Sequence, residues 1–150
     1  MKKYSITELI EEIILLQRAE LSKNNITILK DIHFEGLIYT DRNRLYQVIL
    51  NIIQNSRDAM KDGGTISILT DCYEGKMKLI IKDNGPGISG ETLSKLGTPF
   101  FTTKENGTGL GLATSMKIME ELKGTFEVTS VEGEGTSIIL TIPSDENIII

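Results

Sequence analysis

A glycine-rich segment, Gly107-Thr108-Gly109-Leu110-Gly111-Leu112, joins a polar stretch to apolar residues at helical spacing. Glycine has no Cβ, so its backbone N–H groups can approach a ligand closely. A helix N-terminus adds unpaired N–H donors and the positive end of a dipole. Together these features make an anion site, and phosphate is the usual anion. Turn-to-helix junctions carry similar glycines for steric reasons alone, so this segment by itself leaves both interpretations open.

Three short oxygen-bearing side chains precede this segment on a predicted helix. Asn51, Asn55 and Asp58 stand at positions i, i+4 and i+7, so they share one helical face. Magnesium takes oxygen ligands and commonly bridges a protein to phosphates. The Asn55 carbonyl oxygen suits that role because it adds no negative charge. The alternative is a solvated helix face, although Asn and Asp are poor helix formers.

A turn-like pentapeptide, Asp83-Asn84-Gly85-Pro86-Gly87, directly follows a predicted strand. A carboxylate held at the end of the sheet could accept a hydrogen bond from an exocyclic amine. Gly85 and Gly87 would let a flat ring approach the backbone. For the pentapeptide taken alone, an ordinary Asx or Pro-Gly turn is the simpler interpretation. A later glycine turn ends in Gly135-Thr136, and Thr136 becomes relevant to binding only together with Asp83.

A polar loop contains the run Pro99-Phe100-Phe101-Thr102-Thr103-Lys104. Two adjacent phenylalanines rarely stay exposed, so one or both are expected to pin the loop to the core. Lys104 stands just before the glycine-rich segment, where its ammonium group could reach a phosphate. An isolated loop lysine usually serves only solubility, so both readings stay open.

Hydrophobic periodicity and turn residues predict the elements that position these residues. Ser5 and Asp41 are expected to cap the first two helices. In chain order we expect a helix from Ser5 to about Asn24, strands over 26–34 and 37–39, a helix from Asp41 to about Lys61, strands over 65–73 and 76–82, a loop over 83–107 with a short helix near 91–96, a helix carrying Leu112, Met116 and Met119, and strands over 125–131 and 136–142.

This mixed order, with several strands linked as hairpins, predicts an α+β fold. We expect a two-layer α/β sandwich in which three main helices cover one face of a mixed, mostly antiparallel sheet of about five strands. A doubly wound parallel sheet is disfavoured because strict β-α-β alternation is missing. The 150 residues suit one domain, with a core over about 5–143 and a tail over 144–150.

Composition narrows the function classes. The formal net charge of −5 argues against a nucleic-acid surface, which usually needs a basic stripe. Cys72 is the only cysteine, which excludes an intramolecular disulfide and fits a reducing compartment. Its expected place is a half-buried strand position. We recognise no signal peptide or membrane-spanning segment, and we expect a cytoplasmic segment without membrane contact.

In this order and at these separations, the motifs resemble the ATP-binding catalytic domain of sensor histidine kinases. Residues 51–55 match the N box, 83–87 the G1 box, Phe100-Phe101 the F box and 107–111 the G2 box, with Gly135-Thr136 as the closing Gly-Thr. The resemblance covers the chain from Ser5 to Pro143. The loop sequence and the ending of the N box are similar to the nitrogen-regulation and sporulation-kinase branch.

The resemblance implies the Bergerat fold, which clamps ATP under a mobile lid, here expected over 88–107. It implies that Asp83 hydrogen-bonds the adenine amino group with Thr136 nearby, and that Asn55 binds Mg²⁺. The other residues of the implied nucleotide site are Gly85, Gly87 and Ile88 at the base, Thr102, Thr103, Lys104 and the backbone of Gly107, Thr108, Gly109, Leu110 and Gly111 at the phosphates, and Asp58 and Phe101. Many relatives carry Lys or Arg at the Asp58 position. That phosphate contact would shift here to Lys104 or Arg57, or Asp58 would bind a water of the metal shell.

One position separates activities within the wider superfamily. The gyrase-type, mismatch-repair and chaperone ATPases and the anti-sigma serine kinases carry Glu four residues before the magnesium Asn. This chain has Asn51 there, which cannot act as a base. A histidine acceptor needs no base, since neutral imidazole is already nucleophilic. The resemblance therefore implies transfer of the γ-phosphoryl group of Mg-ATP to histidine, with Asn51, Asn55 and Lys104 as catalytic residues.

The acceptor histidine is expected to lie elsewhere. His33 is the only histidine, and its strand-like context indicates a structural or surface role. The implied partners are a histidine-bearing dimerisation domain of the same or another kinase and, downstream, a response regulator. We do not expect the chain alone to autophosphorylate. A stand-alone ATPase or anti-sigma-type serine kinase, and a non-catalytic nucleotide-binding regulatory module, remain alternatives.

Overall fold

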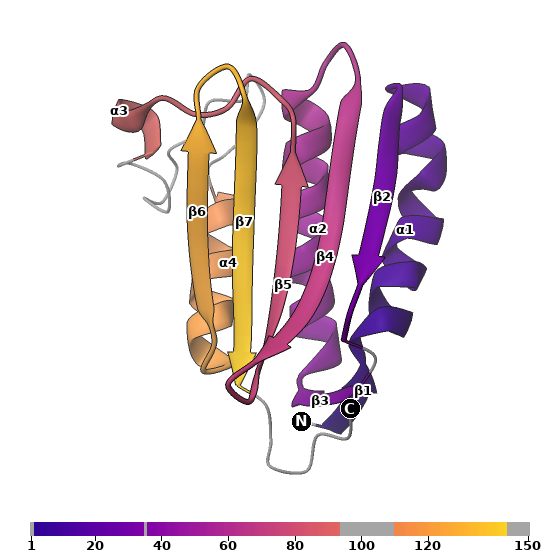
Figure 1. Cartoon of the computed structure of the whole chain (residues 1–150), viewed down its shortest axis with the longest axis vertical. Helices are drawn as coiled ribbons and strands as arrows, with labels where there is room; N and C mark the ends of the chain where they lie inside the picture. Colours follow the sequence, from indigo (N-terminus) through magenta and orange to yellow (C-terminus); the bar gives the residue numbers. More distant parts are fainter. Residues whose placement is uncertain (1, 35, 94–109, 144–150) are drawn as a thin grey trace.

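The structure is a computed structural model that describes residues 2–34, 36–93 and 110–143. A five-stranded sheet forms one layer, and α1, α2 and α4 form the other, against a single face of that sheet (Figure 1). In chain order the elements are β1 (Lys2–Ser5), α1 (Ile6–Lys23), β2 (Ile26–Ile32), β3 (Leu37–Thr40), α2 (Arg42–Ala59), β4 (Gly64–Tyr73), β5 (Lys76–Asp83), α3 (Gly90–Leu93), α4 (Leu110–Glu121), β6 (Thr125–Val131) and β7 (Gly135–Pro143). The predicted α+β two-layer sandwich is confirmed.

The strands of the main sheet stand in the order β2-β4-β5-β7-β6. β2 and β4 run parallel, since β3 and α2 lie between them along the chain and provide the crossover. The other neighbours pair antiparallel. The β4–β5 turn places Glu74 at φ 51° and Gly75 at φ 71°, a backbone that suits a two-residue hairpin. β1 and β3 form a separate antiparallel ribbon.

Both predicted helix caps form. The Ser5 hydroxyl oxygen accepts a hydrogen bond from Glu8 N at 3.2 Å, and Asp41 Oδ1 accepts one from Arg44 N at 3.4 Å. Each bond satisfies an N–H group that has no partner within its helix. The Asp41 cap sets the start of α2, and the last turn of α2 then reaches the end of the sheet where β5 ends and β7 begins (Figure 1).

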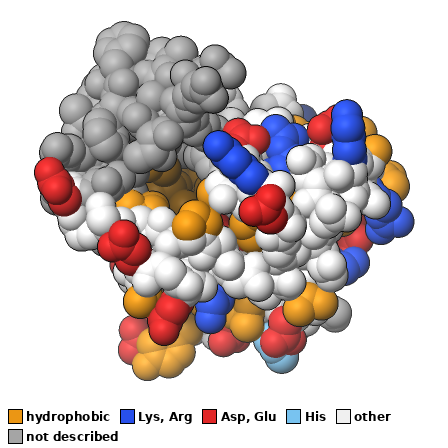
Figure 2. Space-filling model, turned by 90° about the horizontal axis from the view of Figure 1, so that it is seen from above, with side chains coloured by type: hydrophobic (Ala, Val, Ile, Leu, Met, Phe, Trp, Pro, Cys, Tyr) orange, Lys and Arg blue, Asp and Glu red, His pale blue; other side chains and the backbone are white. Residues whose placement is uncertain are grey.

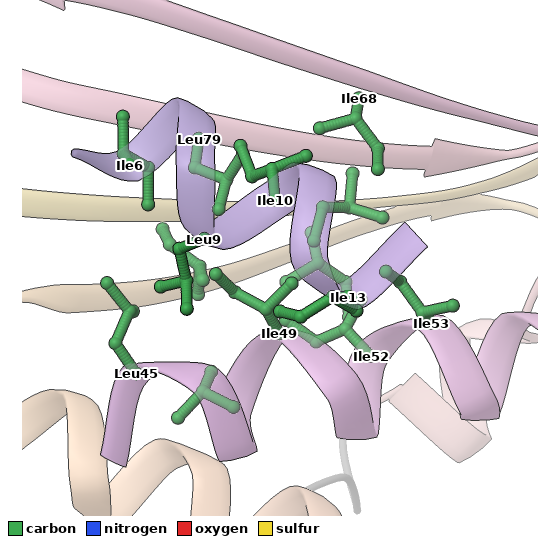
Figure 3. Packing of buried hydrophobic residues seen from close by; sticks show 14 of the residues in the cluster. Ile6, Leu9, Ile10, Ile13, Leu45, Ile49, Ile52, Ile53, Ile68 and Leu79 are labelled. Carbon is green, nitrogen blue, oxygen red and sulfur yellow. The ribbon is translucent and has the colours of Figure 1, made fainter. Parts of the chain in front are cut away.

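The core lies between the helices and the inner face of the sheet. Figure 3 shows Leu9, Ile10 and Ile13 of α1 meeting Ile49 and Ile52 of α2, and each of these side chains is at most 2% exposed. Full burial of such a side chain is worth about 1.5–3 kcal/mol. The packing fixes α2 against the sheet, and so it fixes the position of the polar residues in the second half of that helix.

Element boundaries differ from the prediction at a few points. The sequence does not predict β1, a short and polar strand that forms through its pairing with β3. α2 ends at Ala59, before the predicted end at Lys61, and Met60 follows as a buried C-cap. α3 begins at Gly90 close to the predicted short helix. Cys72 lies half-buried in β4, as expected. Within the described ranges, no helix is long and apolar enough to cross a membrane.

Candidate functional site

Asp83, the last residue of β5, lies where β5 meets β7 and α2. The alternation of β5 buries Met77, Leu79 and Ile81, and Asp83 follows in the same phase at 7% exposure. Across the β5–β7 ladder its Cα partner is Thr136, at the start of β7. A buried carboxylate is costly unless it is hydrogen-bonded. The Asp83 carboxylate at this inward position therefore needs hydrogen-bond donors around it.

Both oxygens of the Asp83 carboxylate accept a hydrogen bond. Oδ2 accepts one from the Ser56 hydroxyl at 2.8 Å, and Oδ1 accepts one from Gly85 N at 3.0 Å. Ser56 is 7% exposed and comes from the last turns of α2, so its bond joins the helix layer to the sheet. Since each carboxylate oxygen offers about two acceptor sites, both oxygens keep capacity for a further donor. The carboxylate can thus bind an N–H or water donor.

Gly85 lies close to this carboxylate and to Met60. A Cβ placed on Gly85 would lie 3.0 Å from Met60 Cγ and 3.1 Å from Asp83 Oδ1, so a larger residue would press against both groups. Met60 is buried and presents an apolar side chain there. An acceptor group, an apolar side chain and an approachable backbone are the features of a site for a small molecule with a flat ring. These features are compatible with a flat ring that carries a hydrogen-bond donor, and the predicted adenine base is such a ring.

The loop that follows β5 is bonded to the β6–β7 hairpin. Gly133 N donates to Pro86 O at 2.6 Å, and Ile88 N donates to Ser130 Oγ at 2.7 Å. The two bonds come from opposite sides: the hairpin donates in the first and the loop donates in the second. They hold the predicted base-binding loop against the β6–β7 hairpin.

Two glycines of this region are required by close backbone approach. A Cβ on Gly87, at φ 74°, would lie 2.3 Å from Val131 O. A Cβ on Gly135, at φ 139°, would lie 2.1 Å from Asp83 O. No side chain fits at either distance, so both positions need glycine for space as well as for backbone conformation. The glycines thus bring the hairpin into contact with the end of β5.

The predicted polar stripe of α2 divides into two parts. Asn51 Nδ2 donates to Ser115 Oγ of α4 at 3.3 Å, and Ser115 is 1% exposed. Asn55 is half-buried one turn further along, and Asp58 is exposed with its Oδ1 3.3 Å from Arg57 Nη2. The Asn51 amide therefore ties two helices together, while Asn55 and Asp58 lie closer to the Asp83 end of α2.

The start of α4 lies at the same end of the molecule. Arg44, in the first turn of α2, forms an ion pair with Glu121, the last residue of α4. The two helices consequently run antiparallel, and α4 begins at Leu110 beside the second half of α2 (Figure 1). This confirms the predicted helix after the glycine-rich segment. The first turn of α4 contains Gly111.

Seven residues of the predicted nucleotide site lie outside the described residues: Phe101, Thr102, Thr103, Lys104, Gly107, Thr108 and Gly109. Most of the predicted lid lies outside them too. Among the residues that are described, no group of three or more His, Cys, Asp or Glu side chains could hold a metal ion. At many protein sites Mg²⁺ keeps several waters and also binds phosphate oxygens of the substrate.

The face of the molecule at this end carries mixed charges. Figure 2 shows acidic and basic side chains interspersed over its described part.

His33 lies beyond β2 and is exposed, with its Nε2 2.7 Å from Asp31 Oδ1, which is a surface position as predicted.

Four contributors were not singled out from the sequence as site residues: Ser56, Met60, Ser115 and Ser130. Ser130 had a readable signal, since it continues the inward phase of Phe126 and Val128 in β6 and is the polar member of that series. Ser56 and Ser115 are small polar residues on helices, and only the tertiary packing shows that each is buried against a polar partner.

The fold is a two-layer sandwich with a buried carboxylate at one end of its sheet, and comparisons with known proteins give its family. Residues 40–146 match the family described as histidine kinase-, DNA gyrase B-, and HSP90-like ATPase. The chain belongs to this family. The match spans both α2 and the end of β7, so it includes every described residue of the site.

Similar proteins place the chain in the histidine-kinase branch of this family. The chain is 39% identical over 144 residues to sporulation kinase E of Bacillus subtilis (strain 168), and 36% identical over 145 residues to sporulation kinase A of the same organism. Each alignment covers 95% of this chain but only 20% and 24% of the two kinases, so the chain spans about a fifth to a quarter of their length. The predicted similarity to sporulation kinases is confirmed.

Solved structures support the same assignment to the histidine kinases. The nucleotide-free catalytic domain of histidine kinase ThkA superposes with a TM-score of 0.86 at 32% identity, covering 95% of both chains. The structure of ThkA in complex with response regulator protein TrrA matches with a TM-score of 0.83 at 29% identity, covering 96% of this chain and 42% of that one. The fold is that of a histidine-kinase catalytic domain.

Proposed function

We propose that this chain binds Mg-ATP at the end of β5 and donates the γ-phosphoryl group to a histidine on a separate dimerisation and phosphoacceptor domain, as part of two-component signal transduction. The observation that carries the proposal is the buried Asp83 carboxylate, held by Ser56 and Gly85 with acceptor capacity to spare. This carboxylate can accept a hydrogen bond from the adenine amino group, and Gly85 beside it carries no side chain that would compete for that position.

The phosphates would extend from the base towards the second half of α2 and the start of α4. Asn55 would hold Mg²⁺ through its carbonyl oxygen, and a bound Mg²⁺ neutralises negative charge on the phosphates. α4 begins at Leu110, and the backbone N–H groups of a helix N-terminus can bind a phosphate. By resemblance, Lys104 and the glycine-rich segment supply further phosphate contacts, and residues 88–107 form the lid.

Phosphoryl transfer to a histidine does not require a general base in this site. A ring nitrogen of the acceptor histidine attacks the γ-phosphorus, a P–N bond forms, the bond to the β,γ-bridging oxygen breaks, and ADP leaves. Catalysis then depends on positioning and charge neutralisation. Asn51 supports this reading, because its amide cannot take a proton from water and its N–H group is bonded to Ser115. In a hydrolase of this superfamily the same position is Glu.

The partners follow from the relatives. The sporulation kinases are several times longer than this chain, so we place the histidine-bearing dimerisation domain in the remainder of a longer kinase or in another kinase. ThkA is seen with the response regulator protein TrrA, which supports a response regulator as the downstream partner here. We propose a cytoplasmic location for the segment, where ATP and response regulators are available.

A carboxylate-to-amide pair of variants tests the base site. Asp83→Asn keeps the shape but replaces an acceptor with a donor, so the affinity for Mg-ATP should fall at least about tenfold in calorimetry. Asp71→Asn is the matched control, since Asp71 is an exposed carboxylate of the neighbouring strand β4. If both variants bind like the wild type, Asp83 does not recognise the base and the proposal loses its main support.

A labelling experiment tests the transfer. The chain alone with γ-labelled ATP should bind nucleotide but keep no stable label, while addition of a histidine-bearing dimerisation domain from a sporulation kinase should give acid-labile label on that domain. Steady phosphate release without a partner would favour a stand-alone ATPase. Acid-stable label on a serine would favour a serine kinase. Tight binding without any transfer would favour a regulatory nucleotide-binding module.

A further inference from the structure

Three side chains form a row across three adjacent strands at the nucleotide end of the sheet. Asp83 of β5 is the Cα partner of Thr136 of β7, and Thr136 is the Cα partner of Ser130 of β6. Directly opposed residues on one face of an antiparallel pair have Cβ atoms about 5 Å apart. The row begins at the carboxylate that the proposed function assigns to the base, and it ends at Ser130, which that function does not use.

Ser130 has three polar neighbours. Its Oγ accepts from Ile88 N at 2.7 Å, lies 2.9 Å from Gly135 O, and lies 2.9 Å from Thr136 Oγ1. A serine hydroxyl has one proton and two lone pairs, so it can satisfy three partners only in one arrangement. Gly135 O can only accept, and therefore it takes the Ser130 proton. Ile88 N–H and the Thr136 hydroxyl then fill the two lone pairs.

This arrangement fixes the direction of the Thr136 hydroxyl. Its proton points to Ser130, so towards a ligand Thr136 Oγ1 can act only as an acceptor. The Asp83 carboxylate beside it is also an acceptor, since its two oxygens take their bonds from Ser56 and Gly85. A ligand at this row, or a water bridging to it, therefore has to present donors. A 6-amino purine does so, whereas a 6-oxo purine presents an acceptor at the same place.

We propose that Ser130 is a positioning residue that holds the Thr136 hydroxyl as an acceptor and thereby makes the site select a 6-amino over a 6-oxo purine nucleotide. The inference rests on the proposed function and deepens it, because it names a residue that sets base specificity without contacting the base. Ser130 also bonds Ile88, the first residue of the predicted lid, so the same hydroxyl joins base recognition to the start of that segment.

ATP and inosine triphosphate are the matched probes, since the two nucleotides differ only at position 6 and the adjoining N1. Calorimetry on the wild-type chain with Mg²⁺ should give a clear preference for ATP. In Ser130→Ala the Thr136 hydroxyl is free to turn and donate, so the ratio of ATP to inosine triphosphate affinity should fall about fivefold. Ser130→Thr keeps the hydroxyl and should restore the wild-type ratio.

Two further variants separate this role from a loss of packing. Thr129→Ala changes the neighbouring, exposed residue of β6 and should leave the ratio unchanged. In a Thr136→Val background, Ser130→Ala should no longer alter the ratio, because the hydroxyl that it directs is gone. A purely structural role for Ser130 would lower both affinities equally and leave the ratio as it is.

The outcomes distinguish the two proposals. If the wild type binds neither nucleotide, the proposed function fails. If the wild type prefers ATP but Ser130→Ala keeps the same ratio while its thermal unfolding midpoint shows a folded protein, the role assigned to Ser130 is overturned and nucleotide binding stands. If Ser130→Thr shows the same altered ratio as Ser130→Ala, the hydroxyl is not the cause and the role is likewise overturned.

Discussion

The two ends of the proposed nucleotide site are constructed differently. At the base end, Asp83, Ser56 and Ser130 are held by bonds that cross between a helix, two strands and a loop. At the phosphate end, Asn55 and Asp58 come from one helix, and the other groups assigned to the phosphates begin only at α4 or lie outside the described residues. The base end is thus held by bonds that also support the fold, whereas the described side chains of the phosphate end project from a single helix.

This difference has a consequence for mutation. A change at the base end disturbs contacts that also support the fold, so stability and binding should fall together. A change at Asn55 or Asp58 removes a group from the side of a helix whose apolar face stays packed. The affinity for nucleotide should then fall, while the free energy of unfolding stays nearly unchanged. The predictions below begin with the largest expected effect.

The contrast is sharpest at two glycines of the β6–β7 hairpin. Gly135→Ala would place a Cβ 2.1 Å from Asp83 O, whereas Gly133→Ala, at φ 85°, would meet no atom within 4 Å. We expect Gly135→Ala to lower the free energy of unfolding by about 3 kcal/mol and to weaken ATP binding as well. Gly133→Ala should cost about 1 kcal/mol, from backbone conformation alone.

Urea unfolding followed by circular dichroism measures both variants. Equal losses of stability would show that backbone conformation, and not contact with Asp83, decides the cost. The base end would then be less tightly integrated than its geometry indicates.

At the phosphate end, Asn55→Ala should abolish magnesium-dependent nucleotide binding and leave the free energy of unfolding within about 0.5 kcal/mol of the wild type. The removed group is a half-buried amide whose expected partner is the metal. Calorimetric titrations of ATP with and without Mg²⁺ measure the effect. Unchanged affinity would exclude Asn55 from the site, and a large loss of stability would erase the distinction between the two ends.

The sequence predicted the fold because its signals are local. Ser5 and Asp41 are caps that act within one turn, and the alternation of β5 marks its buried face before any partner is known. Asp83 and Gly85 could also be selected, since the chemistry of a short motif is carried by the motif itself. The resemblance supplied what the spacing alone could not, namely which ligand such a motif binds.

The partners of the supporting residues could not be predicted, because these partners lie far along the chain. Ser56 meets Asp83 across 27 positions, and Ser130 meets Ile88 across 42. Asn51 shows the same limit, since its helical face matches that of Asn55 but its amide bonds to Ser115, 64 positions away. Only packing decides which residues of one polar stripe contact another helix and which remain available to a ligand.

The bond between Asn51 and Ser115 can be measured as a coupling. Asn51→Ala and Ser115→Ala should each destabilise the chain, and the double variant should show a coupling energy of about 1 kcal/mol, typical of one neutral hydrogen bond. A double-mutant cycle on urea unfolding gives this value. If the coupling is absent while Asn51→Ala still weakens Mg-ATP binding, Asn51 faces the ligand and belongs with Asn55 at the phosphate end.

The smallest expected effect concerns the ion pair between Arg44 and Glu121, which joins the same two helices at the end remote from Asp83. Both side chains are partly exposed, at 41% and 38%, so water and salt screen the pair. Arg44→Gln should cost at most about 0.5 kcal/mol at low salt, less at high salt, and should leave ATP affinity unchanged. Unfolding at two salt concentrations and one calorimetric titration measure this. Loss of ATP affinity in Arg44→Gln would mean that the whole α2–α4 contact positions the phosphates, and the phosphate end would then be as integrated with the fold as the base end.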